Sequence, residues 1–86
     1  MAEEQLVGVV HKYFAQPGVA AVKVTRGTIK TGDKLRYVGH TTDFTDQVAS
    51  MQVNNQPVEE ANVGDFIGVK VKQRVRENDK VYKVVE

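Results

Sequence analysis

The 86-residue sequence contains no cysteine, no tryptophan, only two prolines and no long apolar run. Without cysteine, the chain cannot form a disulfide, a thiol nucleophile or a thiolate metal site. Its apolar stretches are far shorter than the roughly 20 residues that a membrane-spanning helix needs. The N-terminal sequence MAEEQLVGVV is acidic and lacks the basic and then apolar layout of a secretory signal. We therefore expect a small cytoplasmic protein that makes no membrane contact and whose fold is held together by packing alone.

The charged residues are unevenly distributed, although the formal net charge is only +1. Residues 23–36 and residues 66–76 each carry a net charge of +4, whereas residues 40–65 carry −5. This segregation favours a protein that presents one basic face and one acidic face.

The pattern of apolar residues predicts β-strands throughout. Helix signals are weak, and most segments alternate with period two or form short β-branched runs. Residues 59–62 form either one turn of helix or a loop. Gly, Asn and Pro clusters separate the expected strands, as in small barrels and sandwiches, and closure would remove exposed strand edges. The expected strands cover residues 5–14, 19–25, 34–38, 43–54, 65–72 and 79–85.

Three segments, RGTIKTGDKLRYVG, VEEANVGDFIGVKV and VRENDKVY, carry a family resemblance. Together they resemble domain 2 of elongation factor Tu-type translation GTPases. The segment RGTIKTGDKLRYVG resembles a hairpin of that domain, and VEEANVGDFIGVKV resembles a later strand pair. VRENDKVY resembles its closing turn, with Asn78 where relatives usually have Gly. The turn at residues 77–79 predicts a left-handed conformation for Asn78. The resemblance covers about residues 6–85, so we expect residues 1–86 to form one domain. It implies an all-β fold, namely a single Greek-key closed β-barrel of six to seven strands.

The resemblance implies a recognition module that is not an enzyme. The sequence has no GxxxxGK[ST] motif, so no GTPase domain and no cofactor are expected. In elongation factor Tu, domain 2 helps hold the aminoacylated end of tRNA. Relatives carry an acid, an aromatic residue and a base in the segment where this chain has Gln52, Asn54 and Asn55. Similar barrels also occur as C-terminal appendages of peptidase-like proteins and as small stand-alone proteins, which are closest in size.

A cationic run, VKVKQRVR, is the main candidate for a binding surface. If the run is extended, its four cations lie on one face and the valines on the other. A nucleic-acid backbone would relieve the repulsion between these charges. The alternative interpretation is a solvated exterior whose lysines prevent edge pairing. The candidate RNA-binding residues are Lys70, Lys72, Arg74 and Arg76, extended by Lys23 and Arg36 if their strands are neighbours.

The leading hypothesis is a monomeric module that contacts RNA or a ribonucleoprotein through phosphate groups, with little sequence specificity. The alternative is a protein-interaction module that docks on a separately encoded GTPase or enzyme without nucleic acid. A third possibility is an accessory domain that has become separated from its enzyme.

The aromatic and histidine side chains give little further signal. Phe66 is expected in the core, and Tyr37 and Tyr82 are expected to pack in the core or at its rim, with half-exposed rings beside basic neighbours as the alternative. His40 lies near Asp43 and another loop acid, but this grouping fits known metal-ligand spacings poorly. We therefore expect no metal site. The pairs Gly-Asp at 32–33 and 64–65 are interpreted as structural turns.

Overall fold

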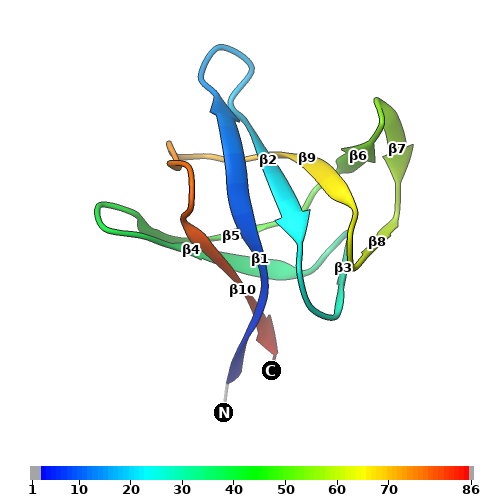
Figure 1. Cartoon of the computed structure of the whole chain (residues 1–86), viewed down its shortest axis with the longest axis horizontal. Coiled ribbons are helices and arrows are strands. Elements are labelled where there is room, and N and C mark those ends of the chain that lie inside the picture. The colour runs from blue at the N-terminus through cyan, green and yellow to red at the C-terminus, as the bar shows by residue number, and fades with distance from the viewer. Residues whose placement is uncertain (1–2, 86) are drawn as a thin grey trace.

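The computed structural model describes residues 3–85, and the fold is all-β (Figure 1). No helix occurs in this part of the chain, and so none that could cross a membrane. Its strands are β1 (Glu3–Phe14), β2 (Val19–Val24), β3 (Thr28–Lys30), β4 (Lys34–Val38), β5 (Asp43–Gln47), β6 (Met51–Val53), β7 (Gln56–Val58), β8 (Glu60–Asn62), β9 (Phe66–Lys70) and β10 (Lys80–Val85).

Eight strands form one antiparallel sheet in the order β5-β4-β10-β1-β2-β9-β6-β7, and β3 pairs separately with β8. The longest strand, β1, pairs with β10 along its first half and with β2 along its second half. Its register shifts at Val7 and at His11, and bulges of this kind bend a strand. Glu3 pairs with Val85, so the first and last described residues lie side by side (Figure 1).

The prediction of a closed barrel with six to seven strands is not confirmed. The strands at the two ends of the sheet order, β5 and β7, are not paired with each other in the described residues. The sheet nevertheless surrounds one apolar cluster, because Phe44 of β5 and Met51 of β6 both belong to it. Four strands, β3, β6, β7 and β8, have only three residues each. Strands this short show too little alternation to be read from sequence, and residues 60–62 were expected as helix or loop.

The core is built from the alternate side chains of each strand that point inward. In β2 the buried positions are Ala20, Val22 and Val24, and the residues between them face outward. Tyr37 is only 1% exposed, so its ring lies in the core and not at the rim. Its ring stacks on Phe44 with centroids 5.0 Å apart. Burial, and to a smaller degree the charge of Asp46, raise the pKa of the Tyr37 hydroxyl.

The two Gly-Asp pairs form tight turns, as predicted. Gly32 and Gly64 have φ angles of 93° and 95°, where a side chain would be strained. Asp33 and Asp65 each accept a hydrogen bond from the backbone amide three residues earlier, at 2.8 and 2.9 Å. Asn78 also has a positive φ of 73°, so the prediction of a left-handed residue there is confirmed.

Candidate functional site

Arg36 does not join the other candidate cations, because two carboxylates hold it. Its Nε and Nη2 donate to the two carboxylate oxygens of Asp43, both at 2.9 Å, and its Nη1 donates to Glu4 at 2.9 Å. These hydrogen bonds, Asp43 first, raise the pKa of Arg36, and the bond from Arg36 lowers the pKa of Asp43. Arg36 lies on β4, which β10 and β1 separate from the strand that carries Lys23. The strands of Arg36 and Lys23 are therefore not neighbours, so the two side chains do not form a shared patch.

The cationic run extends beyond the end of β9, which stops at Lys70. The other three cations lie in an irregular segment, 72–76. Val71 and Val75 are buried but Gln73 is exposed, so the predicted alternation does not hold along the whole run. All four cations of the run are exposed, namely Lys70, Lys72, Arg74 and Arg76.

Two backbone amides show where the chain leaves the sheet. The amide of Val71 donates to the carbonyl of Gly18 at 2.9 Å. The amide of Lys72 donates to the carboxylate of Asp46 on β5 at 3.1 Å. The chain therefore turns from β2 towards β5, and the four cations do not form one straight row.

The structure does bring Lys23 and Lys70 to one face of the sheet. Lys23 on β2 pairs with Phe66 on β9, and Lys70 at the other end of β9 pairs with Val19. Side chains at these positions point outward, because the alternate positions between them on both strands are buried in the core. The outer face of β2 and β9 thus carries one predicted cation near each end.

A groove of about 300 Å³ lies on this outer face, and we call it the aromatic groove. Ala21 and Gly68, which pair across β2 and β9, are its small residues. Its rings are Phe14, 45% exposed, and Phe66, 49% exposed. None of its lining residues is acidic. The full lining is Phe14, Val19, Ala21, Gln52, Asn54, Asn55, Phe66, Ile67 and Gly68.

Each exposed ring of the aromatic groove has a lysine beside it. The Nζ of Lys12 lies 5.5 Å from the centroid of Phe14, and the Nζ of Lys23 lies 5.7 Å from the centroid of Phe66. Both distances are in the range of cation–π attraction. His11 meets the Phe66 ring edge-on with centroids 5.3 Å apart. The groove therefore combines exposed aromatic surface with positive charge.

The position of Phe66 corrects the expectation that it lies in the core. Its neighbour Ile67 and the next residue in that phase, Val69, are each 1% exposed. Because successive side chains of a strand point to opposite faces, Phe66 must point outward. The phase of these β-branched residues was visible in the sequence, but the general preference of aromatic residues for the core outweighed it. No comparable local pattern in the sequence indicated that Phe14 and Lys12 would form part of a groove.

The amide side chains of Gln52, Asn54 and Asn55 line the same groove. Asn54 and Asn55 have φ angles of 54° and 64° and form the turn between β6 and β7. This segment has no aromatic residue, and the rings of the groove come instead from β1 and β9. The amides add hydrogen-bond donors and acceptors without adding charge.

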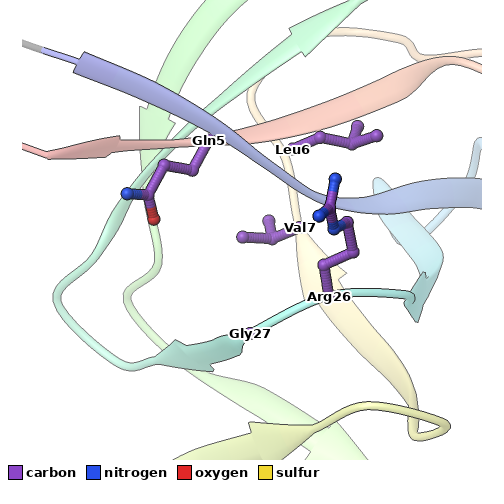
Figure 2. A pocket seen from close by; sticks show the side chains of 5 residues that line it. All are labelled: Gln5, Leu6, Val7, Arg26 and Gly27. Carbon is purple, nitrogen blue, oxygen red and sulfur yellow. The ribbon is translucent and has the colours of Figure 1, made fainter.

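A second hollow, of about 370 Å³, lies between β1 and the turn after β2 (Figure 2). Figure 2 shows the Arg26 side chain reaching from that turn towards β1, beside Val7. The backbone there is fixed because the amides of Thr25 and Arg26 both donate to the carbonyl of Val7. Gln5, Leu6 and Gly27 complete the lining. With one cation and no aromatic ring, this hollow offers fewer contacts to a ligand than the aromatic groove.

Within residues 3–85, no cluster of three or more histidine or carboxylate side chains is arranged to hold a metal ion. The histidine nearest the aromatic groove, His11, has a ring contact with Phe66 but no hydrogen bond to a carboxylate in this part of the chain. The groove is thus lined by apolar and amide groups, with two ammonium groups beside its rings, and such a set suits binding through stacking, hydrogen bonds and charge.

The strands define a small all-β domain. The family model for elongation factor Tu domain 2 matches residues 18–80 of the chain. The chain belongs to the elongation factor Tu domain 2 family.

Several larger proteins contain a similar stretch. The chain is 36% identical over 81 residues to an uncharacterized protease of Methanocaldococcus jannaschii, covering 93% of this chain and 20% of that protein. It is 35% identical over 82 residues to a collagenase of Porphyromonas gingivalis, covering 94% of this chain and 23% of the collagenase. The chain therefore spans about a fifth of the length of the curated relatives it matches.

Solved structures show the same fold. The C-terminal domain of a putative U32 peptidase from Geobacillus thermoleovorans superimposes with a TM-score of 0.85 at 21% identity, covering 92% of this chain and 91% of that domain. Its selenomethionine variant gives a TM-score of 0.84 at 20% identity, covering 90% of this chain and 96% of that domain. At this identity the likeness concerns the fold alone.

Proposed function

We propose that this chain is a non-catalytic recognition module whose aromatic groove binds single-stranded RNA, either free or within a ribonucleoprotein. The observation that carries the proposal is that two half-exposed rings, Phe14 and Phe66, each have a lysine ammonium beside them. Unpaired bases stack on exposed aromatic rings, and nearby cations attract the phosphates that link them. A ligand that is flat and anionic matches both features of the groove.

The proposal reassigns the candidate cations. Lys23 and Lys70 lie on the face that carries the groove, and Lys12 joins them. Arg36 has no role in binding because Glu4 and Asp43 neutralise it. Stacking and phosphate contacts discriminate weakly between bases, so we expect little sequence specificity.

Fluorescence anisotropy with a labelled single-stranded oligoribonucleotide, measured across a salt series, tests the proposal. Phe14→Ala and Phe66→Ala should each weaken binding by about 1–3 kcal/mol, at least about fivefold, because each removes a stacking ring. Val63→Ala is the matched control, since Val63 is 60% exposed and lies outside the groove. Absence of binding at low salt, or equal affinities for Phe66→Ala and Val63→Ala, would reject RNA as the ligand.

The comparisons favour a second candidate function, docking on a protein. Relatives named as proteases contain a stretch like this chain as about a fifth of their length. In this version the exposed rings and lysines bind an acidic surface of a separately encoded enzyme, or of a GTPase. Affinity purification of the tagged chain, with and without ribonuclease treatment, separates the two functions. Co-purification of one defined protein that survives ribonuclease supports docking, whereas loss of the partner on treatment supports RNA.

A further inference from the structure

A further groove lies at the end of β1, next to the aromatic groove but on the other side of the strand. It has a volume of about 430 Å³, and we call it the arginine groove. Tyr13 lines it, whereas the next residue, Phe14, lines the aromatic groove. Consecutive side chains of a strand point to opposite faces, so one strand end separates the two grooves. The arginine groove is lined by Tyr13, Arg74, Val75, Arg76 and Glu77.

The two arginines of this groove carry unneutralised charge. Arg74 and Arg76 are exposed, and within residues 3–85 neither guanidinium has a hydrogen-bond or ion-pair partner. Arg36, in contrast, is held by two carboxylates. The groove also contains one acid, Glu77, which leaves a net positive charge at its lining. An anion would therefore be attracted to this groove.

The backbone that carries the arginines is fixed to β1. The amide of Asn78 donates to the carbonyl of Val10, and the amide of Val10 donates to the carbonyl of Asp79, both at 2.8 Å. The carboxylate of Asp79, itself only 5% exposed, accepts from the amide of Arg76 at 2.9 Å. Between the two arginines, Val75 is 1% exposed and belongs to the core. Because these hydrogen bonds hold the backbone, binding a ligand needs only the arginine side chains to become ordered.

We propose that the arginine groove binds a phosphate group of the strand whose bases stack in the aromatic groove. Guanidinium groups donate paired hydrogen bonds that match the oxygen atoms of phosphate, and they keep their charge at all physiological pH values. Tyr13 lines the same groove, and a tyrosine hydroxyl can donate a further hydrogen bond. The RNA strand passes around the end of β1, with its bases on the Phe14 side and one of its phosphates on the Tyr13 side. This inference rests on the RNA function proposed above.

The test uses a pair of variants with the same change in charge. Arg74→Gln with Arg76→Gln removes two positive charges from the groove, and Arg26→Gln with Lys30→Gln removes two exposed charges elsewhere. The groove variant should weaken oligoribonucleotide binding about tenfold more than the control, as expected for the loss of charge-assisted hydrogen bonds. Because the two arginines share one phosphate, the slope of log affinity against log salt should also fall in magnitude by about 0.7, the value for one phosphate contact on a single strand. Equal affinities and slopes for the two variants would overturn the proposal.

A titration with inorganic phosphate, followed by amide chemical shifts, separates this proposal from the RNA function. Shifts at residues 74–77 that disappear in the Arg74→Gln, Arg76→Gln variant support a phosphate site in the arginine groove. If these shifts occur but no oligoribonucleotide binds, the phosphate site stands and the RNA function fails. If oligoribonucleotide binding depends on Phe14 and Phe66 but not on the arginines, the RNA function stands and the phosphate site fails.

Discussion

The Nζ of Lys23 lies 5.7 Å from the centroid of the Phe66 ring, across the antiparallel pair β2 and β9. Attraction between the ammonium group and the ring holds the positive charge beside the surface on which a flat ligand would stack. Lys12 and Phe14 repeat the arrangement at the end of β1. The two pairs come from three different strands, so the sheet register, and not a local motif, creates the candidate site.

The outward position of Phe66 predicts a contrast in stability between neighbouring residues. Phe66→Ala should lower the free energy of unfolding by less than about 1 kcal/mol, because the side chain is half exposed. Ile67→Ala should lower it by about 2–5 kcal/mol, because it leaves a cavity in the core. Urea denaturation of both variants measures the difference. Equal losses would mean that Phe66 contributes to the core after all.

The Arg36–Asp43 pair predicts a pH dependence. Arg36 lowers the pKa of Asp43 from its ordinary value of 3.8, so Asp43 stays charged in the folded protein at pH values where it is protonated in the unfolded chain. The stabilisation from this pair is therefore fully present above pH 3.8 and is lost as the pH falls through the lower folded-state value. In Arg36→Gln, the Asp43 carboxyl should titrate at higher pH than in the wild type, as NMR of the carboxyl carbon can measure.

Arg36→Gln also tests whether Arg36 lies outside the binding surface. Arg36→Gln should leave oligoribonucleotide affinity close to that of the wild type, whereas Lys23→Gln should weaken it, although each variant removes one positive charge. An equal effect of both would place Arg36 back among the binding residues.

The strands and turns that depend on local patterns could be predicted from the sequence. The turns at Gly32-Asp33 and Gly64-Asp65 need a positive φ and a nearby acceptor, and both requirements are visible in the residues themselves. The outward position of Phe66 was also accessible, because Ile67 fixes the phase of its strand, as Leu35 does for the buried Tyr37. A general expectation about aromatic residues was given more weight than that phase.

The rest depends on contacts between distant residues. Arg36 and Glu4 are 32 positions apart, so no local pattern shows that one neutralises the other. The aromatic groove likewise joins Phe14, Gln52 and Phe66, which are neighbours only through strand pairing. The order of the sheet, with β10 between β4 and β1, has the same non-local origin. Such pairings decide whether side chains with suitable chemistry meet.

The turn that carries Arg76 should be sensitive to a single methyl group. A Cβ atom added at Gly39 would overlap the carboxylate of Asp79, the group that accepts the hydrogen bond from the Arg76 amide. Gly39→Ala should therefore lower the free energy of unfolding by about 1–3 kcal/mol, as overpacking does. Thermal denaturation followed by circular dichroism measures the loss. A melting temperature equal to that of the wild type would show that the turn can move to make room.

Filling the floor of the aromatic groove should separate binding from stability. A Cβ added at Gly68 would meet only the Val19 side chain, at 3.6 Å, which is ordinary van der Waals contact. Gly68 also has no positive φ, so a side chain there causes no backbone strain. Gly68→Val should keep the fold stable, because valine favours strands, while its side chain occupies the space between Phe14 and Phe66.

We expect oligoribonucleotide affinity to fall about tenfold or more if one stacked base is lost, within the range of about 1–3 kcal/mol per base. Gly68→Ala should give a smaller loss. If Gly68→Val folds normally and binds as well as the wild type, the ligand does not lie between the two rings, and binding must be sought at another surface of the sheet.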